Sequence, residues 1–152
     1  MNRVARFVFR APVRLYDNGF GWLLGHRFLC LTHLGRRSGR MYRTVLEVVG
    51  GSGDEYVVVA GLGAGADWFR NIEVRPPVEV VVGRRRFPAA HRVLGEEEAV
   101  AVIAGYEHRN RFAGPVVRFA LGKLLKWRYD GSDLARRRMA RQLPLVGLRP
   151  RS

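Results

Sequence analysis

The chain has 152 residues, of which 27 are Lys or Arg and 13 are Asp or Glu, giving a formal net charge of +14. This length suits one domain with a single hydrophobic core and is too short for two ordinary domains. Hydrophobic residues make up 47% of the sequence, which excludes a disordered basic tail. We therefore expect a folded protein with an anionic partner: a nucleic acid, an acidic membrane surface or a polyanionic small molecule.

The cysteine and histidine content gives little support for a metal site. Cys30 lies within an apolar segment, where a buried structural thiol is expected rather than a nucleophile. His26, His33, His91 and His108 show no i,i+4 pairing and no nearby cluster of Cys or carboxylates, so no metal is predicted. No apolar run reaches the roughly 18 residues that cross a bilayer, and no signal peptide is indicated. The expectation is a cytoplasmic protein, with peripheral contact at the inner face of the membrane left open.

The N-terminal region, residues 1–25, is predicted to be a basic helical arm that precedes a domain over residues 26–152. Residues 2–10 place apolar side chains on one helical face and arginines elsewhere, before Pro12 ends the helix. A short helix or turn is expected over residues 15–25. Such an arm suits a membrane surface or docking against the domain.

Alternation of apolar residues predicts a mainly β domain with flanking helices. Strands are expected at 26–34, 42–50, 55–61, 77–83, 86–94 and 143–149. Helices are expected at 67–74, 95–109, 114–128 and 132–141. Glycine-containing connections at 50–54 and 83–85 indicate hairpins, and Pro76-Pro77 stops the first of the helices. The sum is an α+β fold, mostly antiparallel, with a helical insertion at about 95–141.

One glycine-rich segment imitates a dinucleotide-binding fingerprint. Residues 61–66 match G-x-G-x-x-A after a strand, and Glu79 follows at about the expected distance. A parallel βαβ crossover needs a helix that spans the sheet, whereas this helix is cut short by Pro76-Pro77. We therefore expect these glycines to allow close approach of a ligand or of neighbouring backbone.

The most informative segment is residues 35–44, which places four arginines and two glycines between two predicted strands. Gly35 and Gly39 permit positive φ and expose backbone N–H groups. Guanidinium groups, with the hydroxyls of Ser38 and Thr44, are suited to phosphate. The segment therefore predicts a hairpin that holds an anion, and the plainer alternative is a solvated hairpin tip.

Gly35-Arg36-Arg37-Ser38-Gly39 and Arg43-Thr44, followed by the strand ending at Ala60-Gly61 and by Trp68-x-x-Asn71-Ile72, resemble the deazaflavin-dependent nitroreductase family. The resemblance covers residues 26–94 and the last strand. It implies a split β-barrel, of the kind that binds flavin mononucleotide in related proteins, and coenzyme F420 as cofactor. This cofactor carries a phosphate and a glutamate tail, so the basic hairpin and the overall charge agree with it.

The resemblance also implies a set of cofactor-binding residues. Those matching the phosphate-binding segment are Arg36, Arg37, Ser38 and Arg43. Those expected to line the deazaflavin ring are Thr44, Val45, Ala60 and Gly61. Those that would close over the cofactor are Gly65, Ala66, Asp67 and Trp68, with Asn71 one helical turn on. For Trp68 a core anchor, and for Asn71 a local backbone bond, are the plainer alternatives.

The resemblance implies an F420-dependent oxidoreductase that passes hydride to an electron-poor, lipophilic acceptor: a quinone, an enone, an unsaturated lipid or a nitro compound. No catalytic residue is assigned; Tyr106 and Tyr129 are candidate proton donors, each with packing as the alternative. A non-catalytic F420 or lipid carrier, flavin mononucleotide as cofactor, and a nucleic-acid-binding barrel remain alternatives. The resemblance implies a monomer or a weak homodimer, and the positive charge argues against a tight homodimer.

Overall fold

The computed structural model describes residues 27–61, 63–111 and 114–151, so the predicted N-terminal arm lies outside the described residues. The strands are β1 (Phe28–Leu34), β2 (Met41–Glu47), β3 (Tyr56–Val59), β4 (Glu79–Val82), β5 (Arg85–Phe87), β6 (Ala89–Val93) and β7 (Leu145–Pro150). The helices are η2 (Gly63–Gly65), α2 (Asp67–Val74), α3 (Glu96–Arg109), α4 (Gly114–Leu125) and α5 (Asp133–Gln142). Within these ranges, no helix is both long and apolar enough to cross a bilayer.

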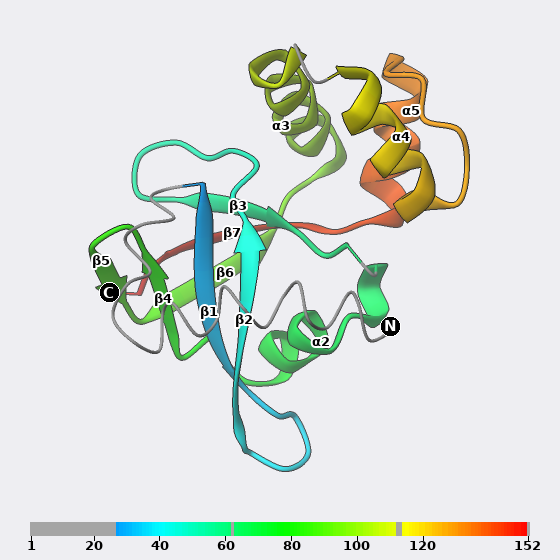
Figure 1. The fold of residues 1–152 in the computed structure, drawn as a ribbon. Coiled ribbons are helices and arrows are strands. Elements are labelled where there is room, and N and C mark those ends of the chain that lie inside the picture. The colour runs from blue at the N-terminus through cyan, green and yellow to red at the C-terminus, as the bar shows by residue number, and fades with distance from the viewer. Residues whose placement is uncertain (1–26, 62, 112–113, 152) are drawn as a thin grey trace.

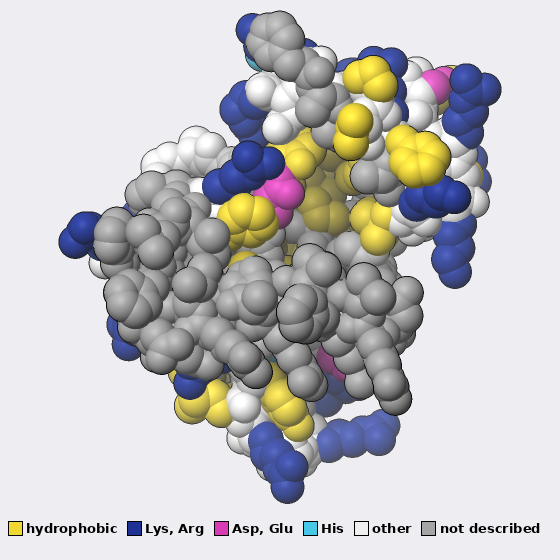
Figure 2. Space-filling view, viewed as in Figure 1, with side chains coloured by type: hydrophobic (Ala, Val, Ile, Leu, Met, Phe, Trp, Pro, Cys, Tyr) yellow, Lys and Arg dark blue, Asp and Glu magenta, His cyan; other side chains and the backbone are white. Residues whose placement is uncertain are grey.

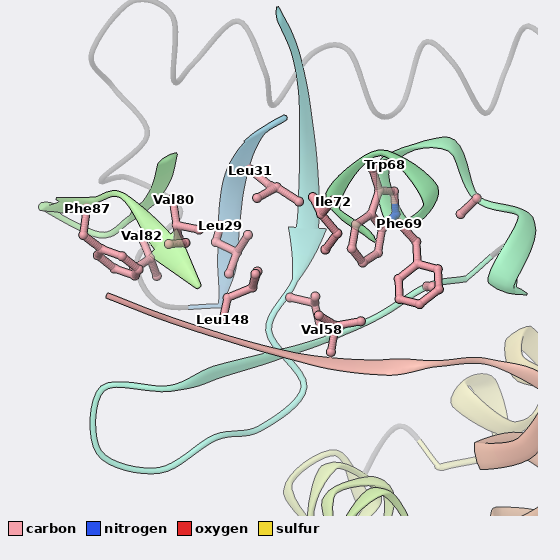
Figure 3. Close-up of a cluster of buried hydrophobic side chains, with 14 residues drawn as sticks. Leu29, Leu31, Val58, Trp68, Phe69, Ile72, Val80, Val82, Phe87 and Leu148 are labelled. Atoms are coloured by element: carbon pink, nitrogen blue, oxygen red, sulfur yellow. The ribbon is translucent and has the colours of Figure 1, made fainter. Parts of the chain in front are cut away.

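The strands form two antiparallel sheets, one in the order β2-β1-β4-β5 and the other in the order β3-β7-β6 (Figure 1). The inner faces of the two sheets and one side of α2 enclose a hydrophobic cluster that includes Leu29, Val58, Trp68, Ile72 and Leu148 (Figure 3). This arrangement agrees with the predicted antiparallel α+β fold.

The single hydrophobic core expected from the chain length is wrong, because the structure has two large clusters. Successive residues of a strand point to opposite faces. Val58 therefore belongs to the cluster between the sheets, whereas Val57 and Leu145 face a second cluster with Ile103 and Leu125. The second sheet is thus buried on both faces, and α3, α4 and α5 cover its outer face.

One predicted strand is divided in the structure, and one predicted hairpin is formed only next to its turn. The sequence predicts a hairpin at residues 50–54, and the chain does reverse there: the N–H of Val49 donates to the carbonyl of Val57 at 2.8 Å, and the N–H of Val57 donates to that of Gly50 at 2.9 Å. The pairing does not continue along β2 and β3, because these strands belong to different sheets. The strand expected at 86–94 is divided at Pro88 into β5 and β6, one in each sheet. The hairpin over residues 83–85 is confirmed, with Val82 paired to Arg85.

The three later helices follow β6 and return the chain to β7, as the predicted helical insertion requires; Figure 1 shows them grouped at one side of the barrel. α4 ends at Leu125 rather than at 128, because Lys126 adopts a positive φ of 65°. The glycine-rich segment after β3 leads through η2 and α2 into β4 of the other sheet. No strand pair among the described residues is parallel, so this segment does not belong to a dinucleotide-binding βαβ unit.

Candidate cofactor site

The basic segment forms the turn of the β1–β2 hairpin. The N–H of Gly35 donates to the carbonyl of Arg40 at 2.8 Å, and the N–H of Gly39 donates to the carbonyl of Gly35 at 2.9 Å. Gly39 has a φ of 71°, which glycine adopts without strain. The N–H of Arg40 donates to Oγ of Ser38 at 3.1 Å. The backbone at the tip therefore has a defined conformation rather than that of an open loop.

Cationic side chains project from this tip and from the adjoining end of β2. Arg37, Arg40 and Arg43 are exposed, and Figure 2 shows Lys and Arg side chains at the end of the hairpin. The hydroxyl of Ser38 accepts from the backbone and so keeps its proton to donate to a ligand. No described heavy atom lies within 4 Å of the position that a Cβ would take on Gly39. Guanidinium groups, a hydroxyl donor and open space beside the backbone are what a bound phosphate requires.

Arg36 differs from the other arginines because its side chain is engaged within the protein. Its backbone N–H and its Nη1 both donate to Oδ1 of Asn71, at 3.0 and 2.9 Å. Its Nη2 lies 3.3 Å from Oδ1 of Asp67, which is largely exposed. The side chain of Arg36 thus holds the hairpin against the first two turns of α2, and Asp67 partly offsets its charge.

The buried amide of Asn71 extends this contact into the core. Its Nδ2 lies 3.0 Å from Nδ1 of His33, and both side chains are buried. Burial lowers the pKa of His33 to about 4, with the carboxylate of Asp67 opposing this effect. The imidazole is therefore neutral at neutral pH, so Nδ1 accepts from the amide and the proton resides on Nε2. The ring of Tyr42, the residue paired with His33 across the hairpin, stacks on the imidazole with centroids 5.9 Å apart.

The residues expected to line the deazaflavin ring do not share one surface. Thr44 pairs with Leu31, which belongs to the core between the sheets. Val45 pairs with Cys30 on the opposite face of the same sheet, where the two form a separate small cluster. Val45, 4% exposed, is therefore buried on one face of β2, whereas Thr44 faces the barrel interior.

The segment after β3 lies at the junction between the barrel and the later helices. The N–H of Ala60 donates to the carbonyl of Pro144 at 2.9 Å, and a Cβ on Gly61 would lie 3.9 Å from Leu124. Ala66 precedes α2 without a side-chain cap, so the first N–H groups of the helix have no side-chain acceptor there. Gly65 is exposed beside it.

Trp68 is part of the hydrophobic core. It is 8% exposed and meets Phe69 edge to face, with centroids 6.0 Å apart. Figure 3 shows both rings among the side chains between the sheets. This position agrees with the core-anchor alternative, in which Trp68 fixes α2 and so places Asp67 and Asn71 beside the hairpin.

The two tyrosines have different surroundings. Tyr106 on α3 donates to Oε1 of Glu47 at 2.6 Å, and burial, strengthened by this carboxylate, raises its pKa to about 12. Tyr129 is buried in the second core and bonds to Glu107, which also pairs with Arg136. Burial, followed by the bond to Glu107, raises the pKa of Tyr129 as well.

A cavity that the sequence did not reveal lies beside Tyr106. It has a volume of about 520 Å³, and residues lining it include Arg27, Glu47, Tyr56, Tyr106 and Arg109. The buried network at His33 was also missed, although His33 falls on the inward-facing alternation of Leu29 and Leu31, which predicts its burial. In the part of the chain that the structure describes, no three His, Cys, Asp or Glu side chains gather in a way that would hold a metal ion.

Comparison with known proteins identifies the class to which this barrel with its basic hairpin belongs. The family model described as F420H(2)-dependent quinone reductase matches residues 9–111. The chain belongs to this family. It is therefore an oxidoreductase whose cofactor is coenzyme F420, as the resemblance implied. No curated protein matches the chain.

Solved structures resemble the fold at low sequence identity. The heme storage protein HutZ from Vibrio cholerae is 17% identical over 91% of each chain, with a TM-score of 0.53. An F420-H2 dependent reductase, FDR-A, is 22% identical over 82% of this chain and 95% of its own, with a TM-score of 0.47. The fold is the expected split β-barrel.

Proposed function

We propose that this F420-dependent reductase acts on a lipophilic, electron-poor acceptor, with a quinone as the first choice. The family description supports the quinone, and an enone, an unsaturated lipid or a nitro compound would accept a hydride in the same way. Reduced F420, when bound, supplies that hydride. The family is one of reductases, which favours turnover over the role of a non-catalytic carrier.

The observation that carries the proposed cofactor site is the fixed basic hairpin. Arg37 and Ser38 would contact the phosphate, because they lie at a tip whose backbone is set by its own hydrogen bonds, and Arg43 would reach it from the adjoining end of β2. Arg36 and Asn71 would act by holding that tip against α2. The other proposed contacts remain those that the resemblance implies: Thr44, Val45, Ala60, Gly61, Gly65, Ala66, Asp67 and Trp68.

Hydride addition leaves a developing negative charge on the acceptor, so a proton must be supplied. We favour Tyr106 over Tyr129 for this role. Tyr106 is partly exposed and lines the cavity beside β2, whereas Tyr129 is 3% exposed. With a pKa of about 12, Tyr106 keeps its proton at neutral pH. Its bond to Glu47 orients the hydroxyl at the cavity wall.

The proposed cofactor is tested by fluorescence titration of the full chain with F420, beside flavin mononucleotide and a short oligonucleotide, at two salt concentrations. We expect saturable binding of F420 that weakens with salt, since the contacts are between charges. Oxidation of reduced F420 by a water-soluble quinone, followed by absorbance, then tests the acceptor. Tight oligonucleotide binding without an F420 signal would overturn the proposal and favour the nucleic-acid-binding alternative.

A further inference from the structure

The surface of α4 combines exposed apolar side chains with cations. Val116 and Phe119 are 70% and 69% exposed, and Leu124 is 41% exposed. Val116, Phe119 and Lys123 follow the i, i+3, i+7 spacing of one helical face. Figure 2 shows hydrophobic side chains at the surface over α4, with Lys and Arg side chains beside them. Apolar groups of this size on one helix normally mark a contact surface.

A hollow of about 570 Å³ lies between the end of α4 and the segment that follows it. It is lined by four cations, Arg118, Lys123, Lys126 and Arg128, together with Phe119, Gly122, Trp127, Tyr129 and Asp130. Of the described residues that line it, only Asp130 is acidic. Aromatic rings and cations therefore line the same hollow.

These four cations differ from the arginines of the neighbouring helix. On α5, Arg136 pairs with Glu107, Arg137 with Glu97 and Arg141 with Glu96. Over residues 27–61, 63–111 and 114–151, none of the four cations of the hollow finds a partner for an ion pair. The Nζ of Lys123 instead lies 5.3 Å from the ring centroid of Phe119. The sequence 114–128 contains no acidic residue, and Asp130, which interacts electrostatically with Arg128, is the acidic residue among those that line the hollow, so the surface keeps a net positive charge.

We infer that the α4 surface, defined as Val116, Arg118, Phe119, Lys123, Leu124, Lys126 and Arg128, docks on an anionic lipid bilayer. A helix with apolar side chains beside lysines and arginines lies in the headgroup region, with its cations on lipid phosphates. The aliphatic groups distinguish this surface from one for nucleic acid, which would offer only phosphates to the cations and bases to the rings. A second copy of the chain is disfavoured, because both copies would present the same positive charge.

This inference deepens the proposed function and rests on it in one respect: a lipophilic acceptor would be met at the surface where α4 docks. Docking itself depends only on the α4 surface as defined above. Cofactor binding and oxidation of reduced F420 by a water-soluble quinone do not require a bilayer, so the two proposals can fail separately.

The test is flotation of the full chain with vesicles of phosphatidylcholine alone or of equal parts phosphatidylcholine and phosphatidylglycerol. We expect binding to the anionic vesicles, weakened by salt. Lys123→Glu with Lys126→Glu should reduce this binding by about tenfold or more. The matched control is Arg149→Glu with Arg151→Glu, which makes the same change in net charge on exposed residues of β7 and after it, and should have a much smaller effect.

Phe119→Ser separates insertion from simple charge attraction. It should weaken vesicle binding at a salt concentration that already screens the charges, and it serves as the second variant if the double reversal does not fold. F420 titration of each variant checks that the barrel is intact. Equal binding by wild type and both α4 variants, with loss only on deletion of residues 1–12, would assign membrane contact to the arm and overturn the inference. The inference would also be overturned if the wild type bound an oligonucleotide but neither kind of vesicle, and the α4 variants lost that oligonucleotide binding.

Discussion

Asn71 uses one side-chain oxygen to hold both the backbone N–H and the guanidinium of Arg36, at 3.0 and 2.9 Å. The amide is 3% exposed, and its nitrogen is in turn bonded to His33. A short helix from one part of the chain thereby fixes the conformation of a hairpin 35 residues earlier. Since Arg37 follows Arg36 directly, this contact determines where the exposed charges of the hairpin point.

The first prediction concerns this contact. Asn71→Ala removes an acceptor for two donors of Arg36 and the donor to His33, leaving buried polar groups unpaired. We expect a loss of about 2–4 kcal/mol in the free energy of unfolding and weaker F420 binding. Asn71→Asp keeps the acceptor for Arg36 and replaces the donor to His33 with a carboxylate that can pair with the Arg36 guanidinium, so it should retain more cofactor affinity than the alanine variant. Thermal unfolding and F420 titration measure the two effects, and equal affinity of all three proteins would remove the positioning role.

The second prediction tests the hairpin as the phosphate site. Arg37→Ala with Arg43→Ala should weaken F420 binding by about 1.5–3 kcal/mol for each arginine replaced, with a smaller effect at high salt. The control pair, Arg149→Ala with Arg151→Ala, removes the same charge from exposed residues near the C-terminus. If the hairpin variant stays within twofold of wild type, the phosphate lies elsewhere. If both pairs weaken binding equally, overall charge rather than the hairpin attracts the cofactor.

The third prediction separates structure from chemistry at Tyr106. Tyr106→Phe leaves the carboxylate of Glu47 without its donor at 2.6 Å, which should cost about 1–3 kcal/mol of stability. Because the hydroxyl of Tyr106 is the proposed proton donor, the same substitution should also lower kcat for quinone reduction. The affinity for F420 should stay near that of wild type. Tyr129→Phe is the comparison, because its hydroxyl bonds to Glu107 within the second core. An unchanged kcat in Tyr106→Phe would exclude this donor.

Local features were predictable from sequence because their causes are local. The β1–β2 hairpin follows from two apolar strands around a glycine-bearing turn, and α2 ends where Pro76-Pro77 requires. The sheet to which a strand belongs depends on distant partners. Pro88 therefore divides one apolar run between two sheets, and the alternation of Val57 and Val58 gives two cores where chain length suggested one.

The candidate site shows the same limit. The charge of the hairpin and the W-x-x-N spacing were visible in the sequence, and the structure brings Arg36, Asp67 and Asn71 together. The partner of Asn71 was not visible, because His33 precedes it by 38 residues on a strand of the barrel. The opposite orientations of Thr44 and Val45 follow from strand alternation alone, yet which of them faces the interior depends on the register between β1 and β2.

The last prediction concerns acid stability and His33. Burial lowers its pKa from 6.5 to about 4, so between these values the unfolded chain binds a proton that the folded protein does not. The free energy of unfolding therefore keeps the full contribution of neutral His33 above pH 6.5 and falls as the pH drops toward 4, by about 3 kcal/mol in total. Protonation would place a positive ring against the amide hydrogens of Asn71. Chemical denaturation at a series of pH values measures this loss.

His33→Gln should flatten the stability profile between pH 6.5 and 4.5, because glutamine does not titrate. His91→Gln is the matched control: His91 lies beside Glu73 at 3.4 Å and away from the hairpin network. Ion-paired carboxylates such as Glu97 and Glu98, whose pKa values lie below 4.5, lose their contribution only at lower pH, so they do not obscure this window. An unchanged slope in His33→Gln would show that His33 is not the group responsible and that its bond to Asn71 tolerates a proton.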